Sequence, residues 1–431
     1  DAQESRGLGD VYKRQVLFRD NLNAIREGGI YMSGKRKKRG SRIGVAISLL
    51  LITVPVMSAC GRWGKGTEGQ FSGKDVSTYD ARNTQEATEA VDWAVGKDIK
   101  QTADEEIQIV PTKASQTTLE LYQSDAFSMQ IPSGWTVETG ADGMFHSIHV
   151  YDPEEPVNQV FLLLKAMPLM HSETGKEYYR QSYEAYGGTY YIMADAPVLA
   201  EPSTENFFRI FPEYASFAEK DEPEYSGYTF PRFNEFTTLE SFESTTSLKD
   251  AALNPAIVHA TFTDAYGNRG EGMFTADVVD FSGNLNSAFG IDAGYYMAYN
   301  IMAITAAENE LIEWQDLLYQ CIGSIQYMDA FISNANAQSD VVVANAMEIR
   351  NTLSEISDGI MASWEARNTS DEIMRQKQSD AILDYDRVYD TETNEIYRAP
   401  LGWLDGYDGT RFKTVTDDNM YTLPIEGTIT E

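Results

Sequence analysis

The sequence predicts an α+β protein in which an antiparallel sheet is followed by a long amphipathic helix and a small C-terminal β unit. Segments that alternate apolar and polar residues, as half-buried strands do, recur between residues 119 and 305. Apolar residues then recur at helical spacing over 308–327 and again over 342–364. Because the strands cluster instead of alternating with helices, a doubly wound parallel fold is disfavoured.

The 431-residue chain is strongly acidic, and its charge is unevenly distributed. Residues 1–59 hold 11 of the 34 basic and five of the 66 acidic residues, which leaves 23 basic and 61 acidic residues, a net charge of −38, after residue 59. Nucleic acid and anionic lipid repel a body of this charge, so we expect no nucleic-acid partner. Hydrophobic residues make up 42% of the chain, which is enough for a buried core.

The first 59 residues are not expected to belong to the folded protein. Residues 5–15 resemble translated sequencing-adapter sequence, so 1–31 are interpreted as non-native and Met32 as the start. Residues 32–59 then read as a signal peptide, in which a basic cluster precedes an apolar run that ends at Met57.

The sequence Met57-Ser58-Ala59-Cys60 resembles the lipobox of bacterial lipoproteins. That resemblance implies cleavage between Ala59 and Cys60 and a diacylglyceryl group on the Cys60 thiol, which anchors an exported protein to a membrane. The alternative is an uncleaved membrane-spanning helix. The apolar run is at the short limit for a span, however, and Pro55 interrupts it.

Residues 60–118 are rich in Gly, Ser, Thr, Asp and Glu and predict a flexible tether, with the folded domain over 119–328. Residues 127–131 and 135–137 alternate around Pro132-Ser133-Gly134, which predicts a hairpin. Two more strands are expected at 145–151 and 159–167, followed by a helix over 175–186 that Gly187-Gly188 ends.

Residues 204–246 hold eleven aromatic residues without a clean period, which predicts an insertion into the domain. One interpretation is an exposed surface that binds a partner, and its candidate residues are Tyr225, Tyr228, Phe230, Phe233 and Phe236. The other interpretation is an irregular segment that its aromatic side chains attach to the core.

Regular patterns return after this segment. Residues 257–263 and 270–281 flank a turn with Gly267, which predicts a hairpin, and 295–305 read as a strand. The helix over 308–327 places Cys321 on its apolar stripe, which favours a core residue over a reactive thiol.

A long amphipathic helix is expected within 329–383, and a small β unit over 384–431. The helix has an apolar stripe at seven-residue spacing, from Val342 to Trp364, that could pack within the chain or form a coiled-coil dimer. With only three heptads, packing within the chain is favoured.

The order of elements over 119–328, with Pro132-Ser133-Gly134-Trp135 between early strands and a last strand leading into the helix that holds Cys321, is similar to the PsbP-like α/β/α sandwich. That resemblance implies an antiparallel sheet between helices and a role in binding or assembly. The C-terminal third resembles the tail of uncharacterised bacterial envelope proteins, through Trp364-Glu365-Ala366-Arg367, Ser379-Asp380-Ala381-Ile382, Arg387-Val388-Tyr389-Asp390 and Pro400-Leu401-Gly402-Trp403.

No catalytic motif is found, and no cofactor is expected. His146 and His149 are three apart on a predicted strand, so they should point to opposite faces and not chelate one ion. Asp384, Asp386 and Asp390 are weak candidates for a calcium site, as are the acids of 405–409, but neither group follows the EF-hand pattern. Solvated acids at turn ends are the favoured interpretation.

The sequence therefore predicts an exported, membrane-anchored lipoprotein that acts as a non-catalytic binding or assembly module for an envelope protein or glycan. Two other classes stay open. One is the substrate-binding lipoprotein of an importer, which would need two doubly wound lobes. The other is a surface hydrolase with a carboxylate pair, which spacing alone cannot identify among 61 acids.

Overall fold

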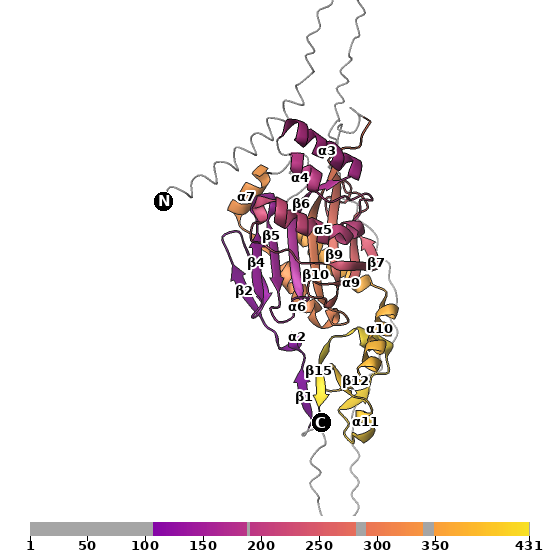
Figure 1. Ribbon diagram of the computed structural model, residues 1–431. Coiled ribbons are helices and arrows are strands. Elements are labelled where there is room, and N and C mark those ends of the chain that lie inside the picture. Colours follow the sequence, from indigo (N-terminus) through magenta and orange to yellow (C-terminus); the bar gives the residue numbers. More distant parts are fainter. Residues whose placement is uncertain (1–106, 188–189, 282–289, 339–348, 431) are drawn as a thin grey trace, which may run out of the picture. The chain divides into compact units, whose positions relative to one another are not determined.

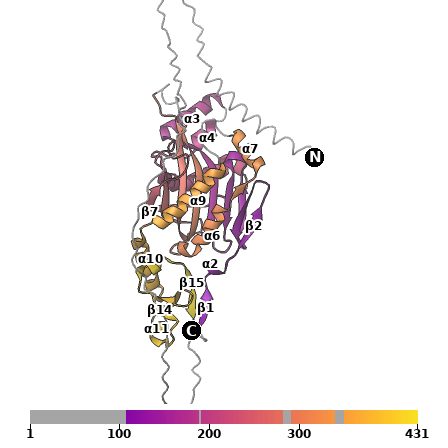
Figure 2. The same ribbon diagram turned by 180° about the vertical axis from the view of Figure 1, so that it is seen from behind.

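The computed structural model describes residues 107–187, 190–281, 290–338 and 349–430. In these ranges the protein is α+β, and its paired strands are antiparallel except for β13 with β15. A seven-stranded sheet has helices on both faces: α5 crosses one face in Figure 1, and α6 and α9 cross the other in Figure 2. The predicted fold class and antiparallel sheet are thus confirmed.

The seven-stranded sheet has the order β4-β5-β6-β10-β9-β8-β7. Its strands are β4 (Thr136–Gly140), β5 (Ser147–Tyr151), β6 (Gln159–Met170), β7 (Asn234–Glu243), β8 (Ala256–Thr263), β9 (Arg269–Asp280) and β10 (Tyr295–Ala307). The expected hairpin of β8 and β9 is confirmed, with Gly267 at a φ of +90° in its turn.

The predicted hairpin around Pro132-Ser133-Gly134 is wrong. β3 (Phe127–Pro132) pairs with β2 (Leu119–Gln123) and β11 (Gln326–Tyr327) in a separate three-stranded sheet, whereas β4 pairs with β5. Trp135 is buried with its ring 5.4 Å from that of Trp314, so the chain turns into the core here instead of folding back on β3.

One face of the large sheet is covered by α3 (Glu173–Tyr186), α4 (Tyr190–Asp195) and α5 (Thr204–Asp221), followed by the short 3-10 turn η3 (Pro223–Tyr225). The predicted end of α3 at Gly187 is confirmed, with this residue at a φ of +72°, whereas the helix starts two residues before the predicted Gly175 because Ser172 caps it. α5 was not predicted. Its apolar residues do recur at helical spacing, but Pro212 inside the helix and the density of aromatic residues obscure the pattern.

The prediction of an exposed aromatic surface is wrong. Tyr225, Tyr228, Phe230, Phe233 and Phe236 are all 8% exposed or less and belong to the core between α5 and the sheet. Residues 204–246 also supply α5 and the edge strand β7, so they are an integral part of this layer rather than an insertion. The aromatic side chains therefore supply packing energy and leave function to other residues.

The other face is covered by α6 (Leu311–Gly323) and α9 (Ile349–Ala366). Leu353, Ile356, Ile360 and Trp364 are buried in that core, so the stripe packs within the chain; Val342 and Ala346 lie outside the described residues. Cys321 is fully buried, and burial raises the pKa of its thiol, which confirms it as a core residue.

The long helix expected over 329–383 is interrupted. Residues 339–348, between α7 (Asp329–Gln338) and α9, lie outside the described residues, whereas two residues separate the end of α9 from the start of α10 (Thr369–Ile382). Asn368 lies at this break, where its side chain accepts a hydrogen bond from Ser370 N at 3.2 Å and caps α10. This side-chain hydrogen bond satisfies a backbone N–H in the first turn of α10, so the new helix starts here.

A five-stranded sheet has the order β1-β15-β13-β12-β14. Its strands are β1 (Gln108–Pro111), β12 (Tyr385–Asp390), β13 (Ile396–Pro400), β14 (Phe412–Thr414) and β15 (Ile425–Thr430), accompanied by α2 (Lys113–Gln116), α11 (Trp403–Gly406) and η5 (Asp418–Thr422). β1 lies in the segment predicted as tether, yet it pairs with β15 near the C-terminus. Residues 108–118 are therefore part of the folded protein.

The ionisation of Glu222, the residue that follows α5, should make the stability of the protein depend on pH. Burial, reinforced by Glu224 and opposed by Lys165, raises the pKa of Glu222 to about 8. The folded protein thus holds a proton that the unfolded chain releases near its ordinary pKa, so stability falls as pH rises from about 4.5 to about 8. We expect Glu222→Gln to unfold about 2 °C or more above the wild type at pH 8.5, with the difference largely gone at pH 4.5.

Thermal unfolding of both proteins across this pH range checks the expectation. Glu213→Gln, an exposed change on the same helix, is the matched control and should shift neither curve. A Glu222→Gln advantage that does not depend on pH would contradict the ionisation argument.

Candidate functional site

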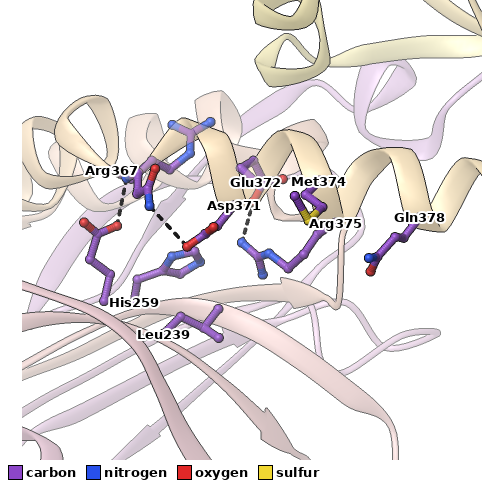
Figure 3. A pocket seen from close by; sticks show the side chains of 10 residues that line it. Leu239, His259, Arg367, Asp371, Glu372, Met374, Arg375 and Gln378 are labelled. Carbon is purple, nitrogen blue, oxygen red and sulfur yellow. Dashed lines mark hydrogen bonds and ion pairs between the residues drawn. The ribbon is translucent and has the colours of Figure 1, made fainter.

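A pocket of about 310 Å³ opens between the sheet edge at β7 and β8 and the first two turns of α10 (Figure 3). β7 supplies Leu239 and Glu240, and β8 supplies His259. The remaining lining residues come from the α9–α10 break and from α10: Arg367, Asn368, Asp371, Glu372, Met374, Arg375 and Gln378.

His259, which lines this pocket, belongs to a buried histidine–carboxylate pair. His259 on β8 and Glu271 on β9 are both almost fully buried, and His259 Nε2 lies 2.7 Å from Glu271 Oε1. Burial alone would raise the pKa of Glu271, but its hydrogen bond to His259 and the nearby charge of Arg375 lower it below the ordinary value. Glu271 is therefore a buried anion, stabilised by the groups around it.

Arg375 connects this pair to α10. Its Nη1 donates to Glu271 Oε1 at 3.0 Å, and its Nη2 donates to Glu372 Oε2 at 2.5 Å. Figure 3 shows Arg375 and Asp371 extending from α10 toward His259 and Leu239. The guanidinium is thereby shared between two buried carboxylates, which uses both of its terminal nitrogens.

The inward face of α10 is polar, which is the reverse of an ordinary surface helix. Glu372, Gln376 and Asp380, spaced four residues apart, are all buried. Met374 and Ile382 on the outside are 60% and 80% exposed. The helix is thus held by hydrogen bonds and ion pairs instead of by an apolar stripe.

These polar side chains continue into the five-stranded sheet. Gln376 Nε2 donates to Asn309 O at 3.0 Å and to Glu372, and its Oε1 accepts from Arg387 of β12. Arg387 Nε in turn donates to Asp380 at 2.7 Å. One connected set of buried polar groups therefore joins the large sheet, α10 and the C-terminal β unit.

Arg398 of β13 extends the same set to α6. Its Nε lies 3.7 Å from Asp380 Oδ1, and its Nη1 lies 3.3 Å from Glu313 Oε1. Burial raises the pKa of Glu313 to about 7, against the opposing effect of Arg398. At Glu313, burial therefore affects the pKa of the carboxyl group more than the opposing charge of Arg398 does.

The residues that the sequence singled out as calcium candidates do not come together. Asp390 is buried and accepts from Arg411 Nε and Nη2 at 2.9 and 2.7 Å, whereas Asp386 accepts from Gly402 N at 2.8 Å. Asp384 lies outside β12 at a φ of +57°. Within the described ranges, no group of three or more His, Cys, Asp and Glu side chains is arranged to hold a metal ion.

The two neighbouring histidines are structural. His146 precedes β5, contrary to the prediction that it lies on the strand, and its Nδ1 is 3.3 Å from Tyr327 Oη. His149 lies on β5 with Nε2 2.7 Å from Gln159 Oε1. Burial lowers the pKa of each to about 4, so both are neutral core residues at neutral pH.

The pocket itself was not predicted from the sequence. Ala59 and Cys60 lie outside the described residues. The only signal at the other end of the chain is that α10 lacks an apolar stripe, because polar residues occupy most of its positions. That pattern indicates a helix whose buried side is polar, but its partners on β9 and β12 depend on the tertiary fold.

No protein-family model matches the chain, and a search of curated proteins finds no match. Among the helices of the described ranges, none is long and apolar enough to cross a membrane.

Proposed function

We propose that this chain is an exported lipoprotein, anchored through Cys60, that acts as a non-catalytic binding or assembly module in the cell envelope. In this proposal the fold is a PsbP-like sandwich extended by α10 and the five-stranded sheet. The partner, an envelope protein or glycan, contacts the outer side of α10 and the pocket beside it.

One observation supports the binding function: α10 buries the charged residues Glu372 and Asp380 and exposes Met374 and Ile382. Met374 also lines the pocket, so a partner that occupies the pocket would cover this apolar side chain as well. The charged groups beneath it pair with each other, which makes the surface rigid before a partner arrives.

A cross-linking experiment tests this function. A photoreactive amino acid at Met374 should give a discrete adduct with an envelope component in intact cells. The same amino acid at Tyr186, which is 87% exposed on α3, is the control and should give none. The adduct counts as support when the component is identified and the purified pair reproduces it; equal labelling from both positions would remove the argument for this surface.

The anchor makes a separate prediction. Cys60→Ser removes the only atom that the lipid-transferring enzyme can modify, so the variant should stay unprocessed or appear outside the membrane fraction. Detergent partitioning and mass spectrometry of the N-terminus are the measurements, and Cys321→Ser is the control because that thiol is buried. Unchanged processing and retention of the Cys60→Ser protein would refute the anchor.

The two other classes gain little support from the site. The pocket lies beside one antiparallel sheet, not between two doubly wound lobes as in an importer's binding protein. A carboxylate pair for hydrolysis needs one member to donate a proton. Glu271 and Glu372 instead both accept hydrogen bonds from Arg375.

A further inference from the structure

We propose that the surface formed by α10 and β7 receives a basic segment of a partner protein, with one lysine or arginine side chain entering the pocket. This inference rests on the proposed binding function and names the chemistry of its partner. The α10–β7 surface is defined here by Leu239, Glu240, Asp371, Met374 and Gln378.

Among the residues that line the pocket, Glu240 and Asp371 offer carboxylate acceptors. One carboxylate oxygen of Glu240 accepts from Asn368 N at 2.8 Å, and one of Asp371 accepts from Asn368 Nδ2 at 3.1 Å. Each carboxylate keeps a second oxygen with lone pairs for an incoming N–H group. A side chain that carries several N–H donors and a positive charge fits this pair of acceptors.

Most of the donors that an anion would need are already engaged, although Arg367 Nε has no hydrogen-bond partner among the described residues. Both terminal nitrogens of Arg375 donate to Glu271 and Glu372. The Arg367 guanidinium stacks 3.8 Å above the Trp364 ring and donates to Trp364 O, and Figure 3 shows it turned away from His259. An anionic ligand that binds Arg375 would therefore have to displace an existing ion pair.

The rim suits the aliphatic part of such a side chain. Leu239 is 43% exposed and Met374 60%, and both line the pocket. A lysine or arginine can lay its methylene groups along apolar side chains while its charged end reaches the carboxylates. Ile382, farther along α10, extends the apolar contact to neighbouring residues of the segment.

The charge of the chain distinguishes between possible occupants. A net charge of −38 after residue 59 attracts a basic segment over distance and repels a second copy of the same chain. It also repels an anionic membrane. A glycan would be expected to stack on the rings of Phe, Tyr or Trp, and none of these is among the described residues that line the pocket.

A peptide titration on the full chain tests the inference. The probes are a fluorescent octapeptide of alternating leucine and lysine, the same peptide with every lysine acetylated, and an alternating leucine–glutamate peptide. The site variant is Glu240→Gln/Asp371→Asn. Its matched control is Glu213→Gln/Asp250→Asn, which removes the same charge from exposed positions elsewhere. Thermal unfolding shows whether each variant keeps the wild-type fold.

We expect the lysine peptide to bind the wild type and the control alike, and the site variant about tenfold more weakly. Met374→Ser, which leaves the carboxylates in place, should also weaken binding. If the site and control variants lost the same peptide affinity, binding would depend only on the overall charge of the protein, and the proposal would be overturned. Tighter binding of the acetylated or glutamate peptide, or protein self-association without peptide, would overturn it as well.

The outcome is separable from the proposed function. If Met374 cross-links to an envelope component in cells but lysine peptides do not bind, the binding module stands and its partner is not a basic segment. If neither result is obtained, the surface is not a binding site.

Discussion

Gly359→Ala is expected to destabilise the fold by about 1–3 kcal/mol, because α9 has no room for a methyl group at this position. A Cβ on Gly359 would lie 2.0 Å from Thr245 Oγ1 and 3.0 Å from Ile257 Cδ1. Thr245 Oγ1 also donates to Glu355 O of α9 at 2.9 Å, so the contact fixes how α9 lies on the sheet. The added methyl group must push the helix outward or break this hydrogen bond.

Gly323→Ala, at the end of α6, is the matched control. Its Cβ would meet Ser357 Oγ at an ordinary 3.5 Å, so the change should be neutral or slightly stabilising. Urea unfolding of both variants measures the difference. Adding Thr245→Ala to Gly359→Ala removes the closest clash and should restore part of the stability. If Gly359→Ala matched Gly323→Ala, the close approach of α9 to Thr245 would be wrong.

The elements that could be predicted from the sequence are those set by local chemistry. Gly187 ends α3, Gly267 allows the turn between β8 and β9, and the stripe from Leu353 to Trp364 identifies the buried side of α9. Each of these signals lies within one element or one turn. They are therefore independent of how distant segments pair.

The elements that failed depend on distant partners. β3 and β4 read as a hairpin, but Trp135 packs against Trp314, which is far away in the sequence. The aromatic residues of 225–236 leave both a surface and a core interpretation open, with the core favoured, because composition does not show what covers them. β1 looks like tether until its partner β15 is known.

The pocket, too, depends on residues that are distant in the sequence. His259 alternates with apolar neighbours on β8, which fits either face of a strand. Only the tertiary fold places it beside Glu271 and brings Arg375 of α10 within 3.0 Å of the same carboxylate. Sequence spacing can indicate that one side of α10 is polar, but it cannot identify the groups that neutralise it.

The largest single effect is expected from Glu271→Gln, about 3–5 kcal/mol of lost stability at neutral pH. The carboxylate is 1% exposed and accepts from His259, Arg375 and Asn309 N. An amide leaves one oxygen for these donors and removes the negative charge that offsets the buried guanidinium. Glu308→Gln is the control, because Glu308 pairs with Arg269, a largely exposed side chain, and should contribute little.

The pH dependence identifies the cause of that loss. Because His259 and Arg375 hold the pKa of Glu271 below its ordinary value despite burial, its contribution is fully present above about pH 4.5 and is lost as pH falls through the lower folded-state pKa. Urea unfolding should therefore show a wide gap between wild type and Glu271→Gln at pH 7 that narrows in acid. In the double variant Glu271→Gln/Arg375→Met, the combined loss should be smaller than the two single losses added together, since the Glu271–Arg375 ion pair can be lost only once, while Glu372 loses Arg375 in the single and the double variant alike. Strict additivity would mean that the two residues act independently, and α10 would then have to be held on the sheet by other contacts.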